Sequence, residues 1–408
     1  MSDPQAYPGS RYHLFIPGPS PVPARILREI SMPTIDHRGP EFAVLGRRVL
    51  SGMQAVFGTR HPVVIYPASG TGAWEAALVN VLSPGDAVLM YETGHFASLW
   101  RAMAERLGFE AELLADGSRC HRTGLPAGWR RPVSAERIHE RLRGDTRHAI
   151  KAVCVVHNET STGTTSDIAQ VRQAIDAAGH PALLMVDTIS GLGSIDYRHD
   201  AWGVDVSVSG AQKGLMLPAG ISFNALSPKA IEASRAARHP RSYWAWNDML
   251  EFNAKGYWPY TPNTNLLFGL SAALAMLETE GLEAVFDRHR RLAAACRAAV
   301  RAWGLEVQCE VEEACSPVLT GVILPAHLDE DRLRLMLYER FQLALGAGLG
   351  KVASRMFRIG HLGNCSEIDL IGVLGAVELG LKRAGLALPG SGVAAAIDVI
   401  DQWHGARE

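Results

Sequence analysis

Ser-Gly-Ala-Gln-Lys-Gly, residues 209–214, is the stretch that decides the fold of this chain. It follows the apolar run Val-Asp-Val-Ser-Val (204–208), so Lys213 stands just past the end of an expected strand. The chain has only six lysines against thirty-four arginines, and a lysine among small residues at a strand end therefore needs its own explanation. Unlike arginine, lysine has an amine that deprotonates when it is buried and can then condense with an aldehyde.

Asp187 gives Lys213 a chemical partner. It ends another apolar run, Ala-Leu-Leu-Met-Val-Asp (182–187), 26 residues before Lys213. A buried aspartate at this place would keep the nitrogen of a pyridine ring protonated, and a lysine with an aspartate is the pair that a pyridoxal 5′-phosphate (PLP) site requires. Taken singly, a solvated loop lysine and a helix-capping aspartate are the simpler explanations. Taken together, the two residues favour the cofactor.

Apolar runs alternate with helical patterns upstream of Lys213. One expected helix has Ile168, Val171 and Ile175 on one face, with Ser166 as its N-cap and Gly179 at its end. Such alternation predicts an α/β fold of parallel strands and crossover helices. The expected strands are residues 63–66, 87–91, 111–114, 149–157, 182–187 and 204–208, and the other expected helices run to residue 82, over 95–107 and over 135–143.

The pattern changes after Thr261-Pro262. A long helical region (271–303, broken near Gly281) is followed by two strands, a helix, a strand and a helix, which together describe a compact α+β domain. These elements are expected near 305–309, 318–324, 329–341, 357–362 and 367–384. We therefore expect an N-terminal arm (1–22), a large PLP-binding domain (23–275), a small C-terminal domain (276–388) and a C-terminal tail (389–408).

Composition excludes several classes of protein. The formal charge is −2 and no basic block is present, which argues against a nucleic-acid partner. The N-terminal residues lack a signal-peptide pattern, and no apolar run approaches the roughly 20 residues that a bilayer requires, so a cytoplasmic protein without a membrane partner is expected. The six cysteines form no Cys-x-x-Cys or Cys/His cluster, which predicts neither a disulfide framework nor a metal site.

Ser69-Gly70-Thr71-Gly72 lies between an expected strand and an expected helix. Free backbone amides and the helix dipole make such a place suitable for an anion, and two hydroxyls add donors. A dinucleotide loop would need a third Gly or Ala where Glu75 stands, so a small phosphate monoester fits better. A purely structural glycine turn remains the alternative.

Two further segments place polar or aromatic groups at the same edge of the expected sheet. His-Asn-Glu-Thr-Ser-Thr-Gly (157–163) follows a buried strand, and ligands bind at the carboxyl ends of parallel strands. Phe96 begins a helix and is a candidate to stack on a pyridine ring, with His95 as its competitor. The simpler interpretation of residues 157–163 is a turn followed by an N-cap. The simpler interpretation of Phe96 is an aromatic side chain of the core.

Arg358 lies in an otherwise apolar strand, Phe-Arg-Ile-Gly-His-Leu-Gly (357–363). A buried guanidinium is costly unless it meets an anion, and its fork suits a substrate carboxylate. An internal salt bridge is the alternative. The nearby glycine-rich stretch 346–351 is not a nucleotide-binding loop, because Val352 replaces the hydroxyl residue that would bind magnesium.

So many motifs in one order make the chain resemble the class V, fold-type I, PLP-dependent aminotransferases of the serine–glyoxylate/alanine–glyoxylate group. The resemblance covers nearly the whole chain and implies a mostly parallel seven-stranded sheet in the large domain. The aromatic residues within 243–246 and 256–260 are most similar to the bacterial serine–glyoxylate branch. The motifs are Phe-Ile-Pro-Gly-Pro-Ser (15–20), Thr-Ile-Asp-His-Arg-Gly-Pro-Glu-Phe (34–42), Ser-Gly-Thr-Gly-Ala-Trp-Glu (69–75), 157–163, Val-Asp-Thr (186–188), Gln-Lys-Gly-Leu-Met-Leu-Pro (212–218), Tyr-Thr-Pro (260–262) and 357–363.

The resemblance also implies roles for single residues. Lys213 would carry PLP, Asp187 would pair with its ring nitrogen, and Arg358 would bind the substrate carboxylate. Tyr260 and Thr261 would reach the cofactor phosphate of a partner subunit, which implies a homodimer or a tetramer. The other implied contacts are Ser69, Gly70, Thr71 and Gln212 with the phosphate, Phe96 with the ring, Ile189 and Thr160 with the cofactor, and Gly18 and Thr160 with the substrate.

The activity implied by the resemblance is transamination from L-serine to glyoxylate, with hydroxypyruvate and glycine as products. Alanine and aspartate are alternative amino donors. Aspartate would need a second cation for its side-chain carboxylate, and the sequence places none. A cysteine desulfurase or lyase on the same fold would need a mobile cysteine, for which Cys309 and Cys315 are the candidates. A non-catalytic binding protein would not need the set of Lys213, Asp187 and Arg358.

Overall fold

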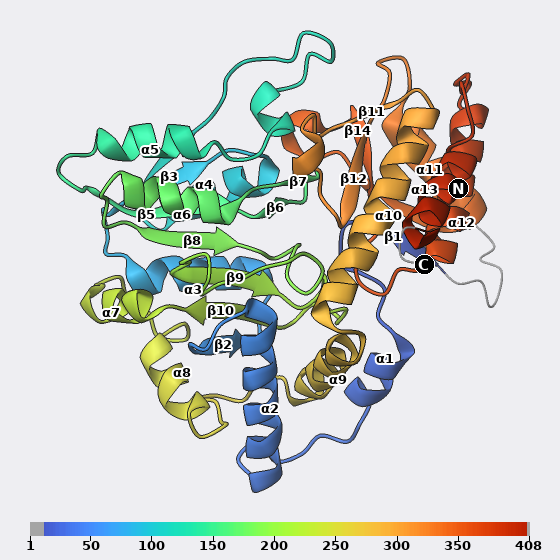
Figure 1. Cartoon of the computed structure of the whole chain (residues 1–408). Coiled ribbons are helices and arrows are strands. Elements are labelled where there is room, and N and C mark those ends of the chain that lie inside the picture. The colour runs from blue at the N-terminus through green and yellow to red at the C-terminus, as the bar shows by residue number, and fades with distance from the viewer. Residues whose placement is uncertain (1–11, 406–408) are drawn as a thin grey trace.

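The computed structural model describes residues 12–405 and contains two separate main β-sheets (Figure 1). The first eleven residues of the expected arm and the last three of the expected tail lie outside the described residues. The larger sheet has seven strands, and the smaller one has five. A two-stranded hairpin, β6 (Asn158–Glu159) and β7 (Thr164–Thr165), is the third sheet.

The larger sheet confirms the expected α/β fold with a mostly parallel seven-stranded sheet. All neighbouring strands pair in parallel except β10, which runs antiparallel to β2 and β9. β10 is also the strand that the apolar runs do not predict, because polar Ser222 and Asn224 interrupt it, although both are buried. The strand order is β2 (Val63–Tyr66), β10 (Ser222–Leu226), β9 (Val206–Gly210), β8 (Leu183–Asp187), β5 (Ile150–Val156), β3 (Ala87–Tyr91) and β4 (Glu110–Leu114).

Helices lie in front of and behind this sheet (Figure 1). They shield strands such as β8 and β9, which are buried at every position. The expected N-cap Ser166 is wrong: Asp167 caps α6 by accepting from the Gln170 amide, while the Ser166 hydroxyl accepts from the Val133 amide. The helices are α2 (Pro40–Phe57), α3 (Gly70–Val81), α4 (His95–Arg106), α5 (Ala135–Arg143), α6 (Ile168–Ala177), α7 (Pro228–Ala236) and α8 (Trp246–Asn253), with a 3-10 turn, η1 (Ala127–Arg130).

The segment before the first large-sheet strand contains two helices that the sequence analysis does not assign. α1 (Ala24–Ile30) packs against α9 (Thr264–Glu280), and α2 packs against α8 and α9. Their apolar residues, among them Ile26, Phe42 and Val49, belong to the core of the larger sheet. The proline-rich stretch before α1 therefore leads directly into packed structure.

The smaller sheet is mostly antiparallel and contains two strands beyond the expected three. β13 occupies part of the glycine-rich stretch, and β1, from the N-terminal segment, pairs with β13 in parallel. The strand order is β1 (His13–Phe15), β13 (Leu343–Ala347), β14 (Met356–Gly360), β12 (Leu319–Ile323) and β11 (Glu306–Val307), with η2 (Glu312–Ala314) and η3 (Gly350–Val352) between strands.

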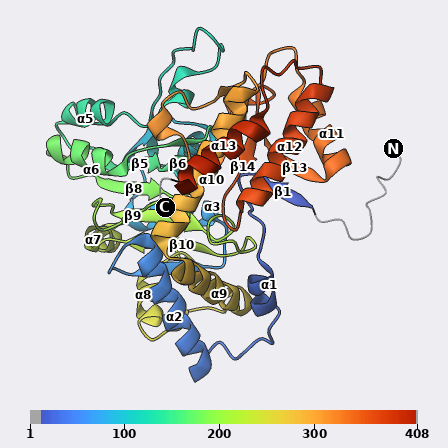
Figure 2. The same ribbon diagram turned by 45° about the vertical axis from the view of Figure 1, so that its right-hand side comes forward.

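The helices of the C-terminal part pack together beside the smaller sheet. Figure 2 shows α10 (Leu282–Ala302), α12 (Glu367–Arg383) and α13 (Gly392–Gly405) side by side, and α11 (Glu330–Phe341) packs on α12. Ala396 and Ile400 of α13 belong to this second core, so the described part of the expected tail packs within its own chain. The domain boundary near residue 275 stays a prediction. Along α10, Val285 still belongs to the first core and Leu292 to the second.

Candidate active site

A cavity of about 510 Å³, counted to its open mouth, lies at the carboxyl ends of β5, β8 and β9 and at the start of α3. Open α/β sheets bind ligands at this edge. The cavity brings together nine residues from five separate stretches of the chain that the sequence analysis singles out, and it adds Trp74, Val156 and Asn158. The nine are Ser69, Gly70, Thr71, Phe96, Thr160, Asp187, Ile189, Gln212 and Lys213.

Lys213 is a buried amine with an unusual environment. Its side chain is 9% exposed, and burial, with a smaller effect from the nearby Arg358 charge, lowers the pKa of the amine to about 8. The Lys213 Nζ donates to the Pro17 carbonyl at 2.5 Å. Gly18 has to be glycine, because its φ is +96° and a Cβ there would lie 2.2 Å from the Lys213 Cδ. The N-terminal segment therefore lies directly against the lysine, and the predicted contact of Gly18 with the substrate stays a prediction.

Asp187 is a buried carboxyl group at the end of β8. It is 4% exposed, and burial is the main reason that its pKa is raised to about 7; the nearby Glu159 raises it further. Two donors hold its oxygens: the Ile189 amide meets Oδ1 at 2.6 Å, and the Trp74 indole nitrogen meets Oδ2 at 3.0 Å. A carboxyl group that faces a cavity in this state is suited to a cationic partner.

The start of α3 forms a place for an anion. The first amides of a helix have no intrahelical carbonyl to bond, and the Ser69 hydroxyl, at the N-cap of α3, makes no capping bond that would satisfy them. The amides of Gly70 and Thr71 therefore stay available, while that of Gly72 donates to the Ser69 carbonyl. The Gln212 side-chain oxygen is buried without a hydrogen-bond partner among the described residues. It lies near Gly210, where a Cβ would be 2.9 Å from this oxygen and 3.3 Å from the Gly70 amide. The amides at the start of α3 are donors of the kind that the predicted phosphate site needs, and the Gln212 side-chain amide lies beside them.

Glu159 is a buried residue of the site to which the sequence analysis gives no role. Its carboxylate accepts from the amides of Phe96 and Ala97 at 3.3 and 3.2 Å and from the Ser161 hydroxyl at 2.6 Å. Burial raises the pKa of Glu159. The carboxylate thus caps α4 and sets the position of Phe96, which lines the cavity. His95 is not among the lining residues and lies next to Gly350 instead.

Arg358 is held beside the cavity by backbone oxygens. Its side chain is 6% exposed, and its Nη1 and Nε donate to the carbonyls of Thr160 and Ala347, both at 2.8 Å. Within residues 12–405 no carboxylate forms a salt bridge with it, although nearby Glu159 and Glu330 favour its charge. Burial lowers the pKa of the guanidinium to about 10. The internal ion pair considered from sequence is therefore not formed, which leaves the guanidinium suited to an anionic ligand.

Tyr260 and Thr261 do not line the cavity of their own chain. The Tyr260 ring stacks on Tyr243 with 4.3 Å between centroids, and its buried hydroxyl has no partner among the described residues. Thr261 is exposed. Their predicted roles toward a partner subunit stay predictions.

The residues considered for a nucleotide-binding loop and for a cysteine desulfurase lie away from the cavity. Lys351 forms an ion pair with Glu92 at 2.7 Å, and the glycine-rich stretch before it is built into β13 and η3. Cys309 and Cys315 pack with Ala314 and do not line the cavity. A desulfurase would need one of these thiols at the cofactor, so the fold gives this rival no support.

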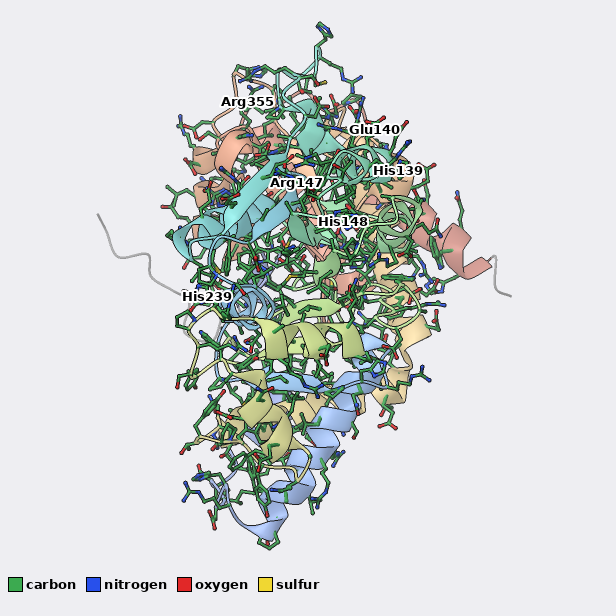
Figure 3. The ribbon with its side chains drawn as sticks, turned by 90° about the vertical axis from the view of Figure 1, so that its left-hand side faces the viewer. His139, Glu140, Arg147, His148, His239 and Arg355 are labelled. Carbon is green, nitrogen blue, oxygen red and sulfur yellow. The ribbon has the colours of Figure 1, made fainter. Side chains whose placement is uncertain are left out.

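Some histidines are buried, such as His199 and His289, and others lie in surface elements. Figure 3 labels His139 of α5, His148 of the loop that follows α5, and His239 of the loop after α7. Across residues 12–405, no group of three His, Cys, Asp or Glu side chains is arranged to bind a metal ion. In the same residues, no helix is long and apolar enough to cross a bilayer.

Comparisons with known proteins agree with this geometry. The sequence profile of class-V aminotransferases matches residues 31–350. Over 95% of this chain, a serine–glyoxylate aminotransferase from Methylorubrum extorquens is 45% identical (95% of its length), and an L-aspartate–glyoxylate aminotransferase from Paracoccus denitrificans is 42% identical (96% of its length). The crystal structure of pyridoxamine–pyruvate aminotransferase from Mesorhizobium loti superimposes with a TM-score of 0.87 at 26% identity, covering 97% of this chain and 98% of that one.

The cofactor of class-V aminotransferases is PLP, and the cavity fits it. The free amides at the start of α3 offer donors at one end, beside the Gln212 side-chain amide, and the buried Asp187 carboxyl and Lys213 amine lie at the other. An anion site, an amine of lowered pKa and an acid of raised pKa in one cavity match the phosphate, the aldehyde and the ring nitrogen of PLP. The chain belongs to the class-V aminotransferase family, whose members work with PLP.

Proposed function

We propose that this enzyme transfers the amino group of L-serine to glyoxylate, giving hydroxypyruvate and glycine. The observation that carries the proposal is the meeting of Lys213 and Asp187 across one buried cavity, with an anion site at α3 and Arg358 beside it. The similarity to the serine–glyoxylate aminotransferase of M. extorquens supports the choice of substrates.

The lining residues divide the tasks of holding the cofactor. We propose that Ser69, Gly70, Thr71 and Gln212 bind its phosphate, that Phe96 and Ile189 pack on its ring, and that Thr160 approaches the ring substituents. Asp187 pairs with the ring nitrogen, since its buried carboxylate needs a cation. When bound, PLP supplies an electron sink for the electron pair left when the Cα proton of the donor is removed.

Lys213 moves the proton. With a pKa lowered to about 8, about a tenth of the amine is neutral at pH 7, and this form can accept the Cα proton of the donor and return it as an acid. The N-terminal segment at Pro17 and Gly18 confines this amine and helps to exclude water from it. Both half-reactions need the same transfer in opposite directions, and one lysine serves both.

Arg358 is proposed to bind the α-carboxylate of serine and of glyoxylate. Two carbonyls fix its guanidinium, so little conformational freedom is lost when an anion binds. Among the described residues that line the cavity, Lys213 carries the only cationic side chain. A donor with a second carboxylate therefore finds no further positive charge there, which favours serine over aspartate.

A panel of amino donors tests this function. With glyoxylate as acceptor and serine, alanine and aspartate as donors, we expect kcat/KM for serine to exceed that for aspartate by at least about 10-fold, because an unpaired buried carboxylate is costly. Addition of serine alone should also change the absorption of the bound cofactor, which a non-catalytic binding protein would not show. A preference for aspartate would overturn the proposed donor and leave the cofactor chemistry intact.

We further propose that the enzyme is a homodimer in which Tyr260 and Thr261 complete the partner's site. Both residues lie outside the cavity of their own chain, Thr261 and Tyr243 are exposed, and the Tyr260 hydroxyl has no hydrogen-bond partner within residues 12–405. Apolar side chains of α1 and α2 are also exposed, among them Leu27 and Val44. Such groups gain partners if a second copy covers them.

Hybrid dimers test the shared site. Mixing Lys213→Ala chains with Thr261→Ala chains should restore activity well above that of either variant alone, because one site in the hybrid receives both native contributions. Size-exclusion chromatography with differently tagged chains confirms that hybrids form. If proven hybrids stay as inactive as the parent variants, each site is built from one chain.

The division of the chain near residues 275 and 388 and a cytoplasmic location remain proposals from the sequence. Limited proteolysis would reveal a cleavable boundary near residue 275, and fractionation of the source cells with immunodetection would locate the protein. Recovery in a membrane or secreted fraction would contradict the location.

A further inference from the structure

Trp74 lies one turn into α3, immediately after the loop that forms the anion site, and its indole reaches across to β8. Its Nε1 donates to the Asp187 Oδ2 at 3.0 Å, and Trp74 also lines the cavity. Because the Ile189 amide holds Oδ1 from the other side, the two donors together fix the orientation of the carboxylate. Trp74 therefore connects the phosphate end of the cavity with the acid at its ring end.

The charges around Asp187 make this donor important. Burial and the carboxylate of Glu159, from β6, oppose its ionisation, and the buried Tyr197 hydroxyl group is also nearby. Lys213, which follows β9, favours the ionised form. A hydrogen bond to a charged oxygen in a buried site is stronger than a neutral one and favours the charged state. The indole N–H is one of two donors that the structure places on this carboxylate.

Trp100 of α4 provides an internal comparison. The two indoles stack with 5.8 Å between ring centroids and 12° between ring planes. Trp74 is 3% exposed and Trp100 is 1% exposed, so both fill the same core. The Trp100 Nε1, however, is buried without a hydrogen-bond partner among the described residues. The two stacked indoles thus differ in that only Trp74 donates to Asp187 and lines the cavity.

We propose that Trp74 is a positioning residue for Asp187: its indole N–H fixes the carboxylate toward the cavity and stabilises its charged form, so that it can pair with the ring nitrogen of PLP. Packing alone would be satisfied by any flat apolar ring at this place. The inference rests on the proposed role of Asp187 toward the cofactor. The proposal gives Trp74 a role that the spacing of the motif at 69–75 and its glycine-rich loop do not explain.

The matched variants Trp74→Phe and Trp100→Phe test the proposal, since each keeps an aromatic ring in the stack and removes one indole. In the cofactor-free protein labelled with carboxyl-¹³C aspartate, Trp74→Phe should raise the pKa of Asp187 from about 7 to about 8 or higher. Trp100→Phe should leave it unchanged. Trp74→Phe should also weaken PLP binding by at least about 10-fold, and Trp100→Phe by less than about 2-fold.

A measurement on the unaltered protein keeps the proposal testable if Trp74→Phe does not fold. The indole N–H resonance of Trp74 should shift with pH at the same midpoint as the Asp187 carboxyl, while that of Trp100 stays constant. Equal effects of the two variants on the pKa of Asp187, or an indole resonance that does not follow Asp187, would overturn the proposal.

Asp187→Asn separates failure of this inference from failure of the proposed function. If that variant binds PLP and transaminates like the wild type, the role of Asp187 toward the cofactor is wrong, and the cofactor half of the inference fails with it. If Asp187→Asn is impaired but Trp74→Phe and Trp100→Phe behave alike, the proposed function stands and only the role of Trp74 is wrong.

Discussion

Lys213→Ala should lower kcat for transamination by about 10³-fold or more, because the variant lacks both the amine that carries the cofactor and the group that moves the Cα proton. PLP can still enter the cavity, since its phosphate and ring contacts remain, but a covalent link to the protein can no longer form. Steady-state and single-turnover kinetics with serine measure the loss, and the absorption of the bound cofactor reports its changed state.

The structure sets the control and the contrary result for this prediction. Borohydride reduction of the wild-type enzyme followed by peptide mapping should label Lys213, whose amine is buried and has a pKa of about 8. Lys255, which is exposed and pairs with Glu251, supplies a matched Lys→Ala control that should keep full activity. Labelling at Lys255 or Lys351 in place of Lys213 would show that the cofactor is carried elsewhere.

Arg358→Ala should lower kcat/KM for both serine and glyoxylate by about 30-fold to 5,000-fold, which corresponds to about 2–5 kcal/mol for a lost charge-assisted contact in a desolvated site. Arg358→Lys should not restore the activity, since an ammonium lacks the planar fork and cannot replace both the carbonyl contacts and the substrate contact. The loss should appear with both substrates, because the α-carboxylate is common to them.

Arg355 is the matched control for Arg358. It lies three residues earlier, outside the cavity, and donates to the Thr123 carbonyl; its side chain is labelled in Figure 3. Arg355→Lys should leave kcat/KM within about 3-fold of the wild type. If Arg358→Ala reduces activity with one substrate and spares the other, a single carboxylate site for both half-reactions is excluded.

The order of strands and helices could be predicted from the sequence because it depends on local patterns. Buried strands of a mostly parallel sheet appear in the sequence as continuous apolar runs. Five of the six ranges expected for the larger sheet coincide with observed strands to within one residue at each end. The sixth, 204–208, begins and ends two residues before β9 does. The same runs place Asp187 and Lys213 at neighbouring strand ends, so the pair at the centre of the site is fixed by position along the chain. β10 and β13 were missed because polar or glycine residues interrupt their runs.

Contacts between distant segments had no such local signal. The placing of Pro17 and Gly18 against Lys213 joins residues 196 positions apart, and the packing of β1 on β13 brings the N-terminal segment there. Glu159 could equally have been a turn residue, and only the folded chain shows that it caps α4 and holds Phe96. The helix cap was likewise decided by the tertiary structure. The Ser166 hydroxyl bonds to the Val133 amide, so Asp167 caps α6 in its place.

The sequence by itself determined the fold and the family, and it placed Lys213 and Asp187 at neighbouring strand ends, because each of these depends on residue types at fixed spacings. The tertiary structure alone decided what surrounds the pair: burial that moves both pKa values, a guanidinium fixed by two carbonyls instead of an internal ion pair, and an indole hydrogen-bonded to the aspartate. Desolvation and hydrogen-bond geometry depend on all elements that pack around a group, and no local stretch of sequence contains that information.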